Sequence, residues 1–129
     1  MKLIKTSNLR WFLLIIIAGV ALLTISDLGK IASAYRRLIT DSKTIRDYLA
    51  SHSVRKLQLG AGVHAPPGWL NTDIFPNRDQ VYLDASQRYP FPDGSFQYVF
   101  AEHMIQTLPW EGGLAMLREC YRVLAPGGK

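Results

Sequence analysis

Short apolar segments separated by turn-forming residues dominate the second half of the chain. They cover residues 57–59, 69–73, 80–84 and 96–100. Segments of this length, bounded by Gly, Pro, Asn and Asp, are typical of β-strands. The first leads into a Gly-x-Gly turn, and the others end in or lead into an acidic residue. The pattern predicts four parallel strands of an α/β sheet, in which ligands bind outside the carboxyl ends of the strands.

Apolar residues at helical spacing flank the predicted strands. Residues 28–40 have one apolar stripe, and a second helix is predicted to begin at Asp41 or Ser42, either of which can cap a helix. The apolar side of this second helix consists of Ile45, Tyr48 and Leu49. A third helix is predicted to begin at Glu111. Its apolar side consists of Leu114, Leu117, Tyr121 and Leu124.

The most apolar part of the chain lies near its N-terminus. Residues 11–26 carry no charge and would form about 24 Å of helix at about 1.5 Å per residue. This is slightly shorter than the roughly 20 residues of a usual membrane span. Three interpretations remain open: a membrane anchor, a signal peptide cleaved near residues 32–34, and a buried core helix. We favour a single-pass anchor, because charged residues interrupt the approach to the cleavage site.

Basic residues are slightly more numerous after the segment than before it, which favours a cytoplasmic location for the rest of the chain.

Composition and charge exclude several kinds of site. The 129 residues suffice for one small domain, and 15 Lys and Arg against 10 Asp and Glu give a net charge of +5. The basic residues are scattered rather than interleaved with aromatic residues, so no nucleic-acid partner is expected. Cys120 is the single cysteine, which excludes an intrachain disulfide and a cysteine metal site. Its place in a helical pattern is typical of a small buried apolar residue, and no metal site is predicted.

The turn after the first predicted strand has the spacing of a dinucleotide-binding loop. Gly60, Gly62 and Ala65 fit the pattern G-x-G-x-x-G/A. Pro66 and Pro67 follow directly, and proline lacks an N–H and restricts the residue before it. A helix N-terminus that offers several amides to a pyrophosphate is therefore not expected. The sequence predicts a loop between the first two strands, which disfavours NAD and favours a ligand without a pyrophosphate.

Longer motifs connect these features to a known family. They are residues 57–62, 68–73, 90–96 and 117–128. In this order they resemble the class I S-adenosylmethionine-dependent methyltransferases, and most closely the group labelled methyltransferase type 11. The resemblance implies a Rossmann-like sheet of which this chain has the first four strands. In the family a fifth strand lies beside the fourth, so the chain is expected to be C-terminally truncated, with residues 96–100 as an unpaired apolar edge.

The resemblance also implies roles for residues at the ends of the strands. Gly60 and Gly62 would line the methionine part of S-adenosyl-L-methionine. Asp73 would accept hydrogen bonds from the ribose hydroxyls. Asp84, together with the amide of Ala85, would face the adenine.

Four further positions complete the predicted site. Gln58 stands where many members of the family have an acidic residue that helps to hold the cofactor, although a glutamine can still donate and accept hydrogen bonds. Ala61 replaces a frequent cysteine in the same loop. Glu102 and His103 lie where the fourth strand of the family ends near the methyl donor. They are the candidates for a catalytic base, and the alternative is that they only shape the loop.

Together these features divide the chain into three predicted segments. An N-terminal tail and anchor covers residues 1–27, leading helices cover 28–54, and a partial methyltransferase domain covers 55–129. The predicted function is methyl transfer from S-adenosyl-L-methionine to a small molecule or glycan, such as a lipid-linked or surface-glycan precursor. Without the later strands the chain is expected to be catalytically silent. The alternatives are a truncated, non-catalytic binding module tethered to the membrane and, less favoured, an NAD-dependent oxidoreductase.

Overall fold

The computed structural model describes residues 19, 27, 28, 30, 31, 35 and 41–129. The chain divides into two units, Met1–Thr40 and Asp41–Lys129. Apart from Gly19, the predicted anchor over residues 11–26 lies outside the described residues. Within the part of the chain that the structure describes, no helix combines the length and the apolar character needed to cross a bilayer.

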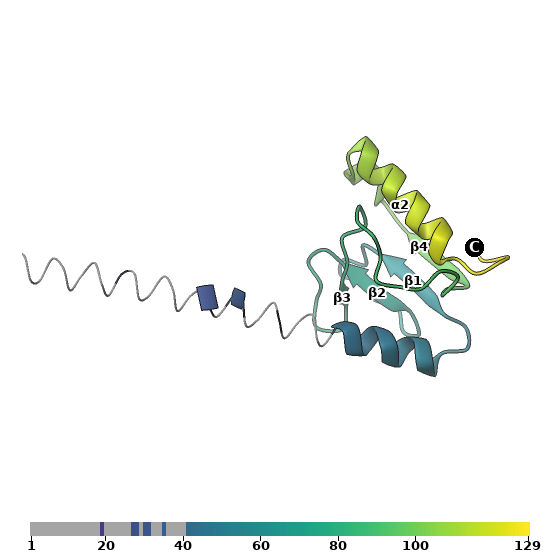
Figure 1. The fold of residues 1–129 in the computed structure, drawn as a ribbon, viewed down its shortest axis with the longest axis horizontal. Coiled ribbons are helices and arrows are strands. Elements are labelled where there is room, and N and C mark those ends of the chain that lie inside the picture. Colours follow the sequence, from purple (N-terminus) through teal and green to yellow (C-terminus); the bar gives the residue numbers. More distant parts are fainter. Residues whose placement is uncertain (1–18, 20–26, 29, 32–34, 36–40) are drawn as a thin grey trace, which may run out of the picture. The chain divides into compact units, whose positions relative to one another are not determined.

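A four-stranded parallel sheet forms the centre of the second unit (Figure 1). Its strands are β1 (Lys56–Leu59), β2 (Leu70–Asp73), β3 (Val81–Tyr82) and β4 (Tyr98–Ala101). Their order is β3-β2-β1-β4, and each neighbouring pair is parallel. The predicted parallel α/β sheet is thereby confirmed. The predicted loop between the first two strands is also confirmed, because residues 60–69 form turns rather than a helix.

Both ends of β3 and the start of β4 differ from the prediction. Gln80 lies outside β3, because its backbone N–H donates to Asn77 O (3.2 Å) in a turn before the strand. Asp84 lies beyond β3, in a turn that Gln87 N–H closes onto its carbonyl (3.1 Å). Phe96 precedes β4 and instead forms an isolated parallel bridge with Leu124.

The predicted second helix covers one side of the sheet (Figure 1). Its described part covers residues 41–51, and Ile45 and Tyr48 are buried in the core as predicted. The Tyr48 hydroxyl accepts the N–H of Lys56 (2.8 Å) and lies 3.0 and 3.1 Å from the carbonyl oxygens of Lys56 and Gly68. This hydroxyl therefore ties the helix to the start of β1 and to the turn before β2.

The helix α2 (Trp110–Val123) lies on the other side of the sheet (Figure 1). Of its predicted apolar side, Leu114 and Leu124 are partly buried, and the prediction was wrong for Leu117 and Tyr121. Its buried residues are Gly113, Met116 and Val123. Met116 and Val123 belong to the same core cluster as the aromatic residues that lead to β4, including Phe96. Leu117 is exposed, and Tyr121 is 84% exposed.

Close packing at the start of α2 accounts for one of its two glycines. A Cβ on Gly112 would lie 3.2 Å from Ser86 Cβ, which is tighter than an ordinary contact. A Cβ on Gly113 would lie 3.5 Å from Ile105 in the short helix η1 (Ile105–Thr107), which is an ordinary contact distance. Glycine weakens a helix, but at Gly112 it lets α2 approach the loop that carries Ser86.

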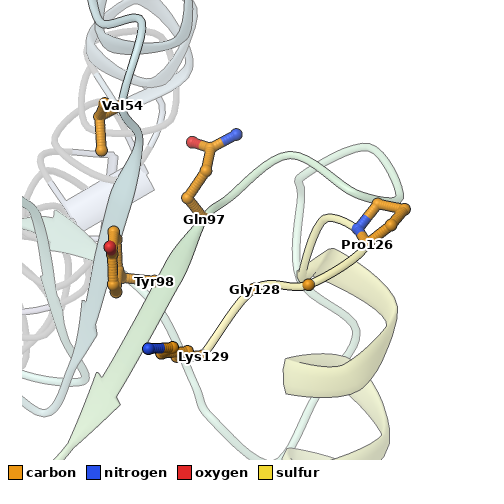
Figure 2. A pocket seen from close by; sticks show the side chains of 7 residues that line it. Val54, Gln97, Tyr98, Pro126, Gly128 and Lys129 are labelled. Atoms are coloured by element: carbon orange, nitrogen blue, oxygen red, sulfur yellow. The ribbon is translucent and has the colours of Figure 1, made fainter.

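The prediction that β4 is an unpaired edge was wrong for the residues at the start of this strand. β4 is the last strand of the sheet, yet Val99 N–H donates to Lys129 O (2.8 Å) and Lys129 N–H donates to Gln97 O (3.0 Å). Figure 2 shows the pocket between β4 and the C-terminal residues 126–129. Its lining includes Val54, Tyr98 and Pro126. The pocket lies at the amino end of β4, away from the edge where ligands of parallel sheets bind.

Candidate functional site

The sheet order places the predicted site residues along one edge. Since all four strands are parallel, their carboxyl ends lie on the same side of the sheet. From β1 the chain continues to β2 and β3 on one side of β1, whereas β4 pairs on the other side of β1. This reversal is the topological switch point, where open α/β sheets bind their ligands. The Gly60 turn after β1 and the loop after β4 meet at this point.

The glycine turn is held in place by the carboxylate at the end of β2. Gly60 and Gly62 have φ values of 63° and 55°, which residues with a Cβ rarely adopt. Asp73 Oδ2 accepts the backbone N–H of Gly62 (2.9 Å), and Asp73 Oδ1 accepts that of Phe75 (2.8 Å). The structure therefore brings Gly62 and Asp73 into direct contact.

The carbonyl side of the same turn is held as well. Gly62 O accepts hydrogen bonds from Asn77 Nδ2 (3.1 Å) and Gln80 Nε2 (2.7 Å). Ala61 is buried, and its N–H donates to Thr72 O (2.9 Å). Asn77 and Gln80 were not predicted as site residues. They lie in a turn whose approach to Gly62 depends on the pairing of β2 with β1 and of β3 with β2.

Asp73 retains the capacity to bind a ligand. A carboxylate has about four lone-pair sites, and the two backbone bonds use one on each oxygen. Each oxygen can therefore accept one further hydrogen bond, as two neighbouring hydroxyl groups of a ribose require. In addition, a Cβ on Gly62 would have no neighbouring atom within 4 Å, so space is open beside this residue. These observations fit a nucleoside at the carboxyl end of β2.

Asp84 and Ala85 lie in a turn that holds itself together. Asp84 Oδ1 accepts hydrogen bonds from the N–H (2.9 Å) and the hydroxyl (2.7 Å) of Ser86. Ala85 is buried, and its carbonyl accepts the hydroxyl of Tyr89 (3.1 Å). Burial raises the pKa of Tyr89 far above its ordinary value, so this hydroxyl stays a donor. One carboxylate oxygen of Asp84 remains without a partner among the described residues.

Gln58 lies within β1, before the glycine turn. It is 6% exposed and pairs in register with Asn71 of β2 and Phe100 of β4. Within the described residues, no hydrogen bond joins its side chain to the loop, and its Oε1 is buried without a partner. The position supports the sheet under the site, and its predicted cofactor contact stays a prediction.

Glu102 and His103 follow β4 and are exposed. His103 has a φ of 53°, a strained value for a residue with a side chain, and its Nδ1 lies 2.9 Å from Gln106 Nε2. Within the described part of the chain, no group of three or more metal-ligating side chains is present. The predicted catalytic role of Glu102 or His103 stays a prediction.

Cys120 lies away from this edge. It is partly buried against the core, and burial raises the pKa of its thiol. A thiol that resists ionisation is a poor nucleophile, in agreement with the interpretation of Cys120 as a small apolar residue.

Comparison with known families identifies the class of protein. A parallel α/β sheet with a glycine turn and an acidic residue at its carboxyl edge is consistent with a Rossmann-like fold. Residues 59–129, more than half of the chain, match the model of a family described as a methyltransferase domain. The chain belongs to this family, within the class I S-adenosylmethionine-dependent methyltransferases. Comparisons with curated proteins and with solved structures gave no match.

Proposed function

We propose that the carboxyl edge of the sheet binds S-adenosyl-L-methionine and that the protein takes part in methyl transfer. The observation that supports this most directly is the hydrogen bond from Gly62 N–H to Asp73 (2.9 Å). It fixes the glycine turn of β1 against the acidic end of β2, so that a ligand crossing the switch point meets both. The family match over residues 59–129 supports the same class of chemistry.

Different residues at the carboxyl edge of the sheet would bind different parts of the donor. Asp73 would accept the ribose hydroxyls, and the turn at Gly60 and Gly62 would receive the methionine portion. Asp84 would accept a hydrogen bond from the adenine amino group through its free oxygen. When bound, the donor supplies a methyl group made electrophilic by the sulfonium. The protein would then mainly orient donor and acceptor. Glu102 and His103, which are exposed after β4, would face the acceptor.

Calorimetry with S-adenosylhomocysteine and with NAD tests the proposal. We expect binding of S-adenosylhomocysteine and none of NAD, because residues 60–69 form no helix whose N-terminus could hold a pyrophosphate. Binding of NAD alone would favour the oxidoreductase alternative. Binding of S-adenosylhomocysteine without methyl transfer to any lipid-linked or glycan acceptor would favour the non-catalytic binding module.

We infer further that residues 11–26 anchor the protein in a membrane, with residues 55–129 in the cytoplasm, and that the acceptor is a lipid-linked or surface-glycan precursor. The uncharged apolar composition of this segment supports the inference. The protein is expected to remain with membranes after carbonate extraction, and deletion of residues 1–27 is expected to release it. Recovery of the full-length chain in the soluble fraction would contradict the anchor.

A further inference from the structure

Met104 lies directly on the glycine turn. A Cβ built on Gly60 would be 2.7 Å from Met104 Cγ, 3.2 Å from Cε and closer still to Sδ. The thioether therefore occupies the space above the Gly60 α-carbon, where other residues have a side chain. Met104 is also partly buried and packs against the core. The side of Gly60 on which a Cβ would project is thus covered by a side chain from the loop after β4.

The loop that carries Met104 is held by local hydrogen bonds. The N–H and hydroxyl of Thr107 both donate to Met104 O, at 3.0 and 2.7 Å. The preceding residue, His103, has a positive φ and contacts Gln106. A residue in this strained conformation persists only where its surroundings stabilise it, and such residues cluster at ligand sites and switches. Here the side chain of the next residue, Met104, lies on Gly60.

We propose that Met104 is a donor-site residue that covers Gly60 in the free protein and is displaced by the methionine portion of S-adenosyl-L-methionine. This rests on the proposed function. The thioether of Met104 occupies the place that the chemically similar portion of the donor needs, so the two exclude each other. A methionine suits this role, because its three rotatable bonds let it leave without a backbone change.

Displacement has a measurable consequence for affinity. Where the binding-competent conformation is a fraction of the population, the apparent affinity falls by that fraction. Shortening the Met104 side chain removes the competitor without changing Gly60 or Asp73. Met104→Ala is therefore expected to bind S-adenosylhomocysteine at least about threefold more tightly than the wild type. Met104→Leu, which retains an apolar side chain of similar size, is expected to stay within about twofold of the wild type.

NMR of ¹³C-methyl-labelled methionine in the full-length protein tests displacement without activity. The Met104 methyl resonance, assigned from its loss in Met104→Ala, is expected to shift on addition of S-adenosylhomocysteine. The Met116 methyl group is the internal control, because Met116 lies on the buried side of α2 and its resonance is expected to stay unchanged. This measurement also reports whether Met104→Ala is folded, since Met116 would then keep its wild-type shift.

The outcomes separate this inference from the proposed function. Binding with an unmoved Met104 resonance, or weaker binding by Met104→Ala, overturns the role of Met104 and leaves the proposed function in place. Failure of both the wild type and a folded Met104→Ala to bind overturns the proposed function and this inference with it. Binding by Met104→Ala alone would support displacement in its strongest form.

Discussion

Replacement of Arg122 by methionine is expected to lower the free energy of unfolding by about 2–3 kcal/mol. The Arg122 guanidinium forms a two-pronged pair with Glu119, at 2.9 and 2.5 Å, and donates to Tyr89 O (3.0 Å) and Phe91 O (2.8 Å). The side chains of Arg122 and Glu119 are only 15% and 13% exposed. The expected loss therefore lies between that of a surface pair and that of a fully buried one. Urea unfolding of the full-length protein at neutral pH measures it.

Arg118→Met is the matched control on the same helix. Arg118 is exposed and has no ion pair or hydrogen bond with another described residue, so its replacement is expected to change stability by less than about 0.5 kcal/mol. If Arg118→Met and Arg122→Met lowered the free energy of unfolding equally, the loss of a positive charge would explain the effect. The hydrogen bonds of Arg122 to the segment before β4 would then not contribute to stability.

The same ion pair makes stability depend on pH. The hydrogen bond from Arg122 lowers the pKa of Glu119 from its ordinary 4.5 to about 2. Because the folded-state pKa lies below the unfolded one, the stabilisation is complete above about pH 4.5 and disappears as the pH falls towards 2. The stability difference between the wild type and Glu119→Gln should therefore narrow over this range. If the difference in the free energy of unfolding stayed constant from pH 6 to pH 3, the lowered pKa of Glu119 would be contradicted.

Local sequence patterns were sufficient for the strands and for the turn after β1. Gly60 and Gly62 mark the end of a strand because only glycine readily adopts their positive φ values. Pro66 and Pro67 disfavour a helix that would run from the glycine turn through them, because proline lacks an N–H and restricts the residue before it. These features depend on neighbours in the sequence, which is why a single sequence predicted them.

The core-facing side of α2 depends on distant residues instead. Two rows of residues on this helix have apolar members at helical spacing, one through Met116 and Val123 and one through Leu117 and Tyr121. Periodicity cannot choose between them. The choice is made by Phe96 and its aromatic neighbours, which pack against the first row.

The part of the site that the sequence did not predict lies at the junction of β1 and β4. Met104 reaches Gly60 because β4 pairs with β1 rather than with β3, and no local pattern indicates this strand order. Asp73 was predicted, but its contact with Gly62 arises from the pairing of β1 with β2. Sequence reasoning therefore identified residue types at strand ends, and the sheet order determined which of them meet.

Replacement of Asp73 by asparagine is expected to weaken the binding of S-adenosylhomocysteine by about 10- to 100-fold, the range for lost hydrogen bonds to a charged group. Asparagine keeps the shape of the side chain but exchanges one acceptor oxygen for an NH₂ group. That group would face the N–H of Gly62 or of Phe75, both of which now donate to Asp73. The variant therefore loses one anchor of the loop as well as acceptor capacity for the ribose. Calorimetry measures the affinity, and amide hydrogen exchange at Gly62 and Phe75 reports the two loop contacts.

Comparison of the two readouts distinguishes binding from positioning. Asp79→Asn is the control, because it makes the same chemical change on an exposed turn and should leave both readouts unchanged. If Asp73 binds the ribose as well as the loop, the loss of affinity should persist when the chemically shorter ligand 5′-methylthioadenosine, which keeps the ribose but lacks the amino-acid portion, replaces S-adenosylhomocysteine. A role restricted to the loop would act through the glycine turn, which receives the methionine portion, and would spare the shorter ligand. Unchanged affinity for both ligands, together with faster exchange at Gly62, would remove Asp73 from the binding site and leave it as a structural residue of the turn.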